Sequence, residues 1–355
     1  VVTFSEGPPK TRVALYLRSQ NAVTRIATLA DGRPALVGMA TENGELTIEE
    51  GEGGQRPIGP ASSYGTLGRI ATNATGSIAV ATSSESAFVR SANGEVATRT
   101  LSDLPIFGTQ PVTATVGIGN DGRLFRVTTG GPPSLLLEDR SVSIDGNGSV
   151  RGAAFTTLGA DTTLPALALV RGDSGDADRN SFELAIPSGD GYARVEVVPA
   201  ATPCKADPQC SSSCTEENVE VEPQEIALAW DGSRALAAFV RRAVTRDRRY
   251  QRKQGSGIVC DFIGCDPYCS SSSSGRTTSA DLVIAAIDVG TRTVRELFAL
   301  PLEVQASMQA PLTLPASSPM ELRAYARDGH LHVALTGKYQ GSFDAVSVYR
   351  FRTSP

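Results

Sequence analysis

The chain has 355 residues, of which 40% are hydrophobic and 20% charged, and its formal net charge is -5. This length and apolar content allow a sizeable buried core and exclude a disordered chain. The mild negative charge offers no overall attraction to nucleic acid or anionic lipid, so any anion binding must be local. No apolar run approaches the ~20 residues that span a bilayer, and VVTFSEG at the start lacks a signal-peptide pattern, which predicts a mature chain without a transmembrane segment.

A repeat runs through the first third of the chain. The segment from Thr24 aligns with the segment from Gly68, and the alignment places Arg25 on Arg69 at an offset of 44 residues. Weaker copies follow, each made of a short apolar run, a residue followed by Gly, and a second apolar run. Because Asp-Gly and Asn-Gly readily form tight two-residue turns, we predict that each copy is a β-hairpin.

Further strand-like runs lie between these hairpins, so units of about four strands recur roughly every 45 residues, a period typical of β-propeller blades. A blade cannot bury both faces of its own sheet, so blades must pack against one another around an axis. We predict an all-β, six-bladed β-propeller that forms a single domain over residues 1–355. Seven blades remain the alternative, because residues 112–200 divide in more than one way.

The two ends of the chain predict how the ring closes. The run Arg12 to Ser19 precedes the first full unit, while the last unit, Glu321 to Arg352, has three clear strands and lacks an outer fourth. The N-terminal strand is therefore expected to complete the last blade. A helix is the alternative for residues 233–254, which contain good helix formers, but the repeat register favours a second blade strand over Ala235 to Val240.

All six cysteines lie in two short runs: Cys204, Cys210, Cys214, Cys260, Cys265 and Cys269. The first run falls in the link before the strand EIALAW, and the second falls between the second and third strands of the same unit. In an up-and-down sheet these two connections lie on the same side. We therefore predict that insertions 200–224 and 241–280 form a knob on one face of the propeller.

Disulfides are the expected state of these cysteines. The spacings lack the C-x2-C pairs typical of zinc sites and of redox motifs. Each run holds three cysteines, so complete pairing requires at least one bridge between the runs. Disulfides indicate an oxidising compartment, which predicts an extracytoplasmic protein in the periplasm, on the outer surface or secreted. The serine tracts 211–213 and 270–274 are interpreted as flexible tethers.

The second insertion carries the strongest concentration of positive charge. The candidate binding residues are Arg241, Arg242, Arg246, Arg248, Arg249, Tyr250, Arg252 and Lys253. Arginine forks suit phosphates, acidic sugars and acidic protein surfaces. The alternative is a solvated hairpin whose arginines pair with the glutamates of the neighbouring link, which are Glu216, Glu217, Glu220 and Glu222. Nucleic acid is not favoured, because no recognition module is present.

Other polar patterns predict little chemistry. His330 and His332 share one face of a strand, but no third histidine exists, so no metal site is predicted. The alternation of Asp176, Asp178 and Asn180 resembles the start of a Ca²⁺ loop, although the later ligands of such a loop are missing. A polar loop is the favoured interpretation, and no other cofactor is predicted. No G-x-S-x-G elbow is present, and no catalytic residue is assigned.

The function predicted from these features is a non-enzymatic binding or scaffold module. Its expected partner is a protein, or an anionic surface or polysaccharide, held by the cysteine-stapled, arginine-rich face, and peripheral or lipid-anchored membrane association is compatible with this. The alternatives are a propeller hydrolase or lyase acting in the central channel and a structural subunit of a bacterial cell-surface assembly. Only 4 of the 33 basic residues are Lys, which indicates a GC-rich bacterial genome.

Overall fold

The computed structural model describes a large part of the chain. The described residues are 2–3, 11–17, 24–28, 34–39, 45–49, 55–60, 70–73, 77–81, 86–91, 93–100, 115–119, 122–127, 133–137, 141–146, 148–158, 164–172, 180–202, 204, 213–252, 260–261, 264–265, 269–302, 321–339 and 343–353. All regular elements among them are β-strands, so the predicted all-β class is confirmed and the helical alternative for residues 233–254 is wrong.

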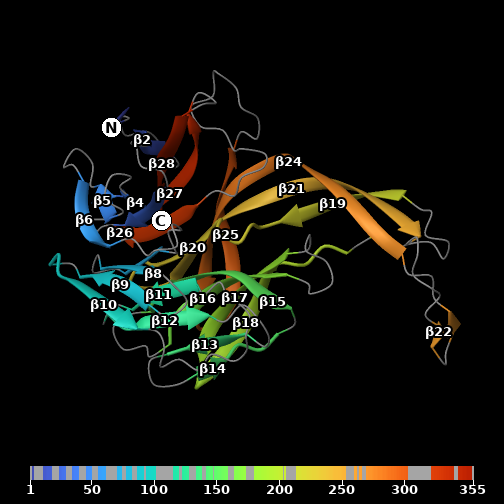
Figure 1. Ribbon diagram of the computed structural model, residues 1–355, viewed down its shortest axis with the longest axis horizontal. Coiled ribbons are helices and arrows are strands. Elements are labelled where there is room, and N and C mark those ends of the chain that lie inside the picture. The colour runs from blue at the N-terminus through green and yellow to red at the C-terminus, as the bar shows by residue number, and fades with distance from the viewer. Residues whose placement is uncertain are drawn as a thin grey trace.

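The strands form consecutive antiparallel sheets in chain order (Figure 1). The first two comprise β3 (Thr24–Thr28), β4 (Pro34–Met39), β5 (Glu45–Glu49) and β6 (Gln55–Pro60), then β7 (Ile70–Thr72), β8 (Ile78–Ala81), β9 (Ser86–Arg90) and β10 (Val96–Thr100). The next two comprise β11 (Thr115–Ile118), β12 (Leu124–Val127), β13 (Ser134–Leu136) and β14 (Ser141–Ser143), then β15 (Ser149–Thr156), β16 (Ala166–Gly172), β17 (Asn180–Ser188) and β18 (Gly191–Val198). The 44-residue repeat therefore relates the first sheet to the second.

The remaining sheets contain the longest strands. One comprises β19 (Ser213–Glu220), β20 (Ile226–Trp230), β21 (Ala235–Arg252), β24 (Cys269–Asp288) and β25 (Thr293–Leu302). The last comprises β26 (Leu322–Arg327), β27 (His330–Tyr339) and β28 (Phe343–Arg352), followed at its edge by β2 (Thr11–Leu17) and β1 (Val2–Thr3). A separate small ribbon pairs β22 (Cys260–Asp261) with β23 (Gly264–Cys265).

The inner strands identify the fold. Five strands that each lie at an edge of their sheet contact one another in chain order: β7, β11, β15, β20 and β26. These five sheets are therefore blades of an all-β propeller, arranged as a ring. β3 also contacts β7 and β26.

The N-terminal strand closes the last blade as predicted. β2 pairs antiparallel with β28, with Leu15 opposite Ser347 and Leu17 opposite Ala345. The blade β26–β27–β28 thus receives its fourth strand from the opposite end of the chain, which links the two ends of the sequence through backbone hydrogen bonds.

The core lies between neighbouring blades. In β21, Leu236, Ala238 and Val240 pack with the blade β26–β28, while the alternate residues Ala235, Ala237 and Phe239 pack with the blade β15–β18. The rings of Phe239 and Phe182 lie 4.7 Å apart. Because both faces of this blade are covered, the strand is a continuous apolar run and does not alternate apolar with polar residues.

β21 and β24 continue well beyond the ring as a long antiparallel ribbon (Figure 1). β19 pairs with the outer part of β21, along the edge that β20 occupies nearer the ring. We call this three-stranded projection the arm; it comprises β19, the outer part of β21 (residues 242–252) and the outer part of β24 (residues 269–279). The expectation that the second strand ends near Val240 is wrong, because hydrogen-bonded pairing continues to Arg252.

The serine tract in the arm also differs from expectation. Ser270 to Ser274 were predicted to be a flexible tether, but they form part of β24 opposite Asp247 to Gln251. Pairing with a long partner strand overrides the low strand preference of consecutive serines, because each residue gains its place in the ladder from β21. Of the other tract, Ser213 begins β19, while Ser211 and Ser212 lie outside the described residues.

Candidate binding arm

Alternation along β21 separates the predicted binding residues into two sets. Arg242, Arg246, Arg248 and Tyr250 lie on a face of the arm that is buried or half-buried, which we call the covered face. The intervening residues, from Arg241 to Arg249, lie on the opposite, outward face. The side chain of Arg252 and all of Lys253 lie outside the described residues.

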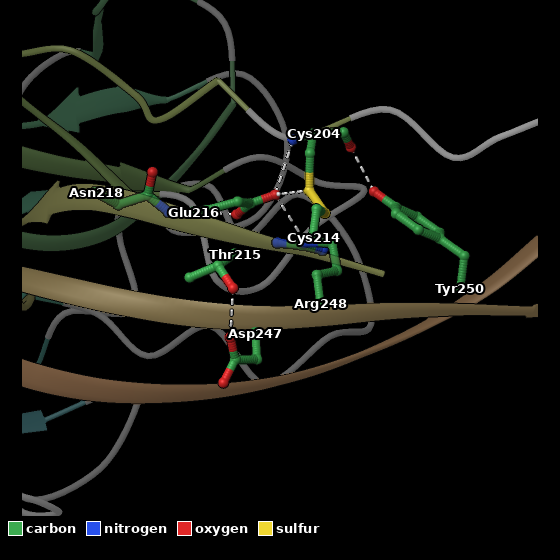
Figure 2. The surroundings of a disulfide bond; sticks show 8 residues. All are labelled: Cys204, Cys214, Thr215, Glu216, Asn218, Asp247, Arg248 and Tyr250. Atoms are coloured by element: carbon green, nitrogen blue, oxygen red, sulfur yellow. Dashed lines mark hydrogen bonds and ion pairs between the residues drawn. A yellow bond between two sulfur atoms is a disulfide. The ribbon is translucent and has the colours of Figure 1, made fainter. Parts of the chain in front are cut away.

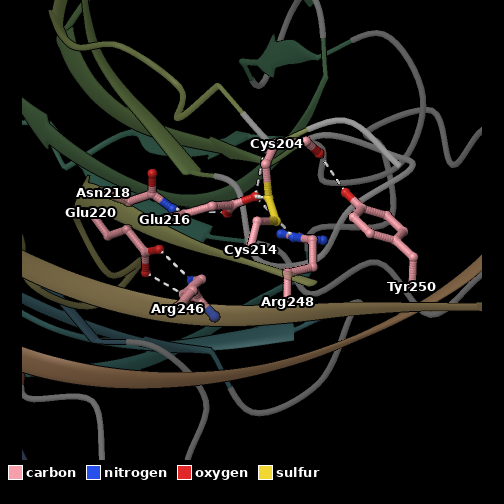
Figure 3. A network of polar contacts seen from close by, with 8 residues as sticks. All are labelled: Cys204, Cys214, Glu216, Asn218, Glu220, Arg246, Arg248 and Tyr250. Atoms are coloured by element: carbon pink, nitrogen blue, oxygen red, sulfur yellow. Dashed lines mark hydrogen bonds and ion pairs between the residues drawn. A yellow bond between two sulfur atoms is a disulfide. The ribbon is translucent and has the colours of Figure 1, made fainter. Parts of the chain in front are cut away.

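Ion pairs fill the covered face. Arg246 binds Glu220 through two parallel bonds, with Nε 2.8 Å from Oε1 and Nη2 2.7 Å from Oε2 (Figure 3). Nearer the ring, Arg242 donates to both carboxylate oxygens of Glu225, and this pair is almost fully buried. Burial by itself would lower the pKa of Arg242, but hydrogen bonding and charge from Glu225 outweigh burial and raise it. These guanidinium groups are therefore fixed and neutralised.

The outer end of the covered face is tied to the incoming link. Arg248 Nε donates to Glu216 Oε1 at 3.1 Å, and the same oxygen accepts a 2.8 Å hydrogen bond from the backbone N–H of Cys204. Tyr250 donates its hydroxyl proton to the carbonyl of Cys204 (Figure 2). Cys204 and Cys214 form a disulfide at this point. The arm and the link before it are thus joined by covalent, ionic and backbone contacts.

The alternative prediction, a hairpin whose arginines pair with glutamates of the neighbouring link, therefore holds for part of the arginine run. Glu216 and Glu220 were expected as ion-pair partners and are confirmed. Glu225 was missed; it precedes the inner strand β20 by one residue, and only the side-by-side placement of β20 and β21 brings it to Arg242.

Glu222, another of the expected partners, lies near the same charges. Burial and the nearby charge of Glu225 raise the pKa of Glu222 above its ordinary value.

The outward face keeps exposed cations. Arg241 pairs with Glu296 at 3.0 Å and with Asp281 at 3.5 Å, close to the ring. Arg249 on β21 and Arg276 on β24 are exposed, and neither has an ion pair among the residues that the structure describes. Between them Asp247 accepts a 2.7 Å hydrogen bond from Thr215. Arg276 was not among the predicted residues, because it lies in the run SGRTTS, away from the arginine cluster.

The cysteine predictions are supported in part. The expected disulfide state is confirmed for one pair, Cys204–Cys214, which lies within the first run. Cys210 lies outside the described residues, and the side chains of Cys260, Cys265 and Cys269 are likewise not described. The bridge between the two runs therefore stays a prediction. Glu216 lies beside the sulfurs of Cys204 and Cys214, but disulfide sulfurs are not the thiolates that bind metals.

The remaining candidates lie away from the arm. His330 and His332 have ring centroids 6.4 Å apart, and His332 stacks on Tyr325. Burial, followed by the charge of Arg350, lowers the pKa of His332 to about 4. Asn180 begins β17, whereas Asp176 and Asp178 lie outside the described residues, so the Ca²⁺ hypothesis stays untested.

One cavity of about 600 Å³ is lined by residues of three blades, from β14 and the residues after it, from the β17–β18 hairpin and from the turn before β25. Its lining is mostly polar and includes Ser143, Asp145, Asp190, Tyr192 and Arg292. Arg292 donates to Ser188 at 2.8 Å, and Tyr192 donates to the carbonyl of Pro165 at 2.9 Å. This cavity contains none of the predicted binding residues.

Comparison with known proteins gives similarity of structure only. No protein-family model and no curated protein matches the sequence. Among solved structures, a streptogramin B lyase is 11% identical, with 94% of this chain and 97% of that chain covered and a TM-score of 0.40. YCF48 bound to D1 peptide is 9% identical, with 99% and 98% covered and a TM-score of 0.42. The WD40 domain of SCAP from fission yeast is 8% identical, with 95% and 98% covered and a TM-score of 0.35.

At these identities and TM-scores the similarities carry no argument about activity or ligands. The propeller assignment rests on the order and contacts of this chain's own sheets. The described residues contain no helix that is long and apolar enough to cross a bilayer.

Proposed function

We propose that the protein is a non-catalytic, extracytoplasmic β-propeller of six blades that holds an acidic partner protein through its arm. The sixth blade is the sheet β3–β6, and this count is supported by the contacts of β3 with β7 on one side and β26 on the other. The extracytoplasmic location is supported by the Cys204–Cys214 disulfide, since such bonds persist in oxidising compartments.

The observation that carries the proposal is that the arm has a fixed structure and projects from the ring (Figure 1). Arg246 and Arg248 are held by glutamates on the covered face, which fixes the arrangement of β19 against β21. Arg249 and Arg276 are consequently displayed on the outward face of a rigid sheet. Rigid display lowers the conformational entropy lost on binding, which favours specific recognition.

Charge decides the class of partner. With a net charge of -5, the molecule as a whole does not attract polyanions, so two exposed arginines on a projection give a local, directional attraction. Such an arrangement suits carboxylates of an acidic protein surface, because each planar guanidinium can form two parallel hydrogen bonds with a carboxylate.

Binding to poly-L-glutamate at graded salt concentration tests this function. The wild-type protein is expected to bind at low salt, and the double variant Arg249→Ser/Arg276→Ser is expected to bind about tenfold more weakly, because it loses two charge-assisted contacts. Arg295→Ser is the matched control, since Arg295 is exposed on β25 in the ring. It should bind like the wild type.

Anionic vesicles separate a protein partner from a lipid surface. When phosphatidylglycerol vesicles are pelleted in the same buffer, the protein should stay in the supernatant. Equal binding by the double variant and the wild type would overturn the assignment of the arm. If the protein bound the vesicles but not polyglutamate, its partner would be an anionic surface and not an acidic protein.

A further inference from the structure

In the part of the chain that the structure describes, the outer part of β24 forms an open sheet edge. β21 pairs with β24 along its whole length, from Cys269 to Ile287, whereas β25 pairs only from Ala280 to Asp288. Among the described strands, none pairs with the other edge of residues 269–279. In an antiparallel sheet every second residue on such an edge directs its N–H and C=O groups outward, so this edge presents a row of donors and acceptors.

This edge lacks the features that usually block strand addition. Protected edges carry prolines or several charges or are short. Residues 269–279 contain no proline, and their only charged side chain is Arg276. The pairing with β21 is regular from Cys269 to Thr277, and a bulge at Thr278 interrupts it on the ring side. The accessible, regular edge is therefore about nine residues long, as long as an ordinary strand.

The side chains along this edge are small. Ser272 to Gly275 are exposed, and Gly275 lies opposite Arg246, where a Cβ atom would approach Arg246 Nη1 to 3.1 Å. Small side chains leave the edge backbone accessible to a second strand. On the outward face Arg276 and Arg249 stand near this edge, on the first and second strands from it. A strand added there would place its outward side chains beside Arg276, within reach of an ion pair.

We propose that the edge of β24 from Cys269 to Thr277 binds an extended, acidic segment of a partner protein by strand addition. The partner's backbone pairs with β24, and carboxylates at its alternate, outward positions contact Arg276 and Arg249. This inference rests on the proposed function and adds the mode of recognition. A second copy of the chain is a poorer occupant, because edge-to-edge pairing would gather the arginines of both copies on one face.

Synthetic peptides provide the test. The probe is a fluorescently labelled ten-residue peptide of alternating Thr and Glu, added to the full-length protein and followed by fluorescence anisotropy. A Thr-Lys peptide tests the need for negative charge. A Thr-Glu peptide methylated on every second backbone nitrogen keeps the charge but loses the donors that strand addition requires. The Thr-Glu peptide should bind, and each of the other two should bind at least tenfold more weakly.

Proline substitutions test the edge from the protein's side. In neighbouring residues of β24 one N–H points to β21 and the next points outward, so one of Ser271→Pro and Ser272→Pro removes an outward backbone donor and keeps the N–H groups that pair with β21. The variant that keeps the wild-type melting temperature and circular dichroism spectrum should lose at least tenfold in binding of the Thr-Glu peptide. Should both variants unfold the arm, the methylated peptide alone decides.

The outcomes separate the two proposals. Equal binding of the methylated and unmethylated Thr-Glu peptides overturns strand addition but leaves the arm as an acidic-protein binder. Failure of both the Thr-Glu peptide and polyglutamate overturns the proposed function as well. A dimer that appears in analytical ultracentrifugation of the wild type and disappears in the folded proline variant would assign the edge to a second copy, against the inference.

Discussion

The two halves of β21 show two different ways to stabilise a sheet. From Ala235 to Val240 the strand runs through the ring, and every side chain is at most 2% exposed. From Arg242 to Arg252 the same strand runs through the arm, where Arg242, Arg246 and Arg248 pair with glutamates. The inner half is covered on both faces by blades, whereas the outer half has one covered face. The ring therefore uses apolar packing, and the arm uses ion pairs and a disulfide.

The largest expected effect comes from the ring half. Phe239→Ala should lower the free energy of unfolding by about 3–5 kcal/mol, because Phe239 is 2% exposed and its removal leaves a cavity beside Phe182. Urea denaturation followed by circular dichroism measures the loss. Val219→Ala is the control in the arm, since Val219 is 43% exposed, and its effect should stay within about 0.5 kcal/mol.

In the arm, removing an ion-pair partner should cost a similar or smaller free energy, and the loss of stability should be confined to the arm. Arg248→Met leaves Glu216 buried without its guanidinium, and breaking such a pair typically costs about 3–5 kcal/mol. Hydrogen exchange should show faster exchange in β19 and outer β21, with the ring unchanged. Adding Glu216→Leu should recover part of the protection, because no unpaired charge remains. If the ring lost protection equally, the arm and the ring would form one cooperative unit.

The same contacts change the expectation for a binding variant. Serine at Arg246, Arg248 and Arg249 together would be a simple test of binding if all three arginines were exposed. Arg246 and Arg248 are instead held by buried glutamates, so that triple variant should also loosen the arm. Arg249→Ser, which touches no described ion pair, is the clean substitution.

Removing the disulfide should have a moderate effect. The pair Cys204→Ser/Cys214→Ser opens a short loop, with a separation of 10 residues, for which loop-entropy arguments give about 3 kcal/mol or less. Faster hydrogen exchange in β19 is expected, again with the ring unchanged. A loss of the ring's melting temperature as large as that of Phe239→Ala would contradict the separation of the two regions.

Disulfide mapping sharpens the comparison without altering the protein. Because Cys204 and Cys214 pair with each other, complete pairing of the six cysteines requires Cys210 to bridge to Cys260, Cys265 or Cys269. Mass spectrometry of non-reduced proteolytic fragments should find that one bridge between the two runs. Its absence would leave backbone pairing and ion pairs as the only ties between the link and the ribbon.

The smallest effect is a pH dependence in the ring. Burial lowers the pKa of His332 to about 4 from an ordinary value of 6.5, so the unfolded state binds this proton more readily. The contribution of His332 to stability is complete above pH 6.5 and is lost as the pH falls from 6.5 to about 4. In His332→Phe the melting temperature should therefore decline less over this window. An unchanged slope would mean that other groups control it.

Much of the ring could be predicted from local sequence. Short apolar runs separated by Asp-Gly and Asn-Gly define hairpins, and Gly122 and Gly232 do adopt positive φ at such turns. The repeat register placed Ala235 to Val240 on a second blade strand, and the missing fourth strand of the last blade predicted the pairing of β2 with β28. These features depend on periodicity, which each segment carries by itself.

The candidate site was less predictable because its contacts join distant segments. The sequence allowed two interpretations of the arginine run, an exposed binding face and a hairpin of arginine–glutamate ion pairs. Strand alternation places some arginines in ion pairs on the covered face and others exposed on the outward face. Arg276 was missed because its position on the outward face depends on the register of β24 against β21. Serines 270–274 were expected to be unstructured because composition does not show which partner strand is available.

The sequence by itself determined the all-β class, the hairpin units and the pairing of the two chain ends, since turn chemistry and apolar periodicity act over a few residues. Only the tertiary structure decided that β21 and β24 extend beyond the ring, which arginines are neutralised and which edge of the described strands has no partner strand among them. Those properties depend on which strand lies beside which, and a register shift of one residue would exchange the covered and outward faces.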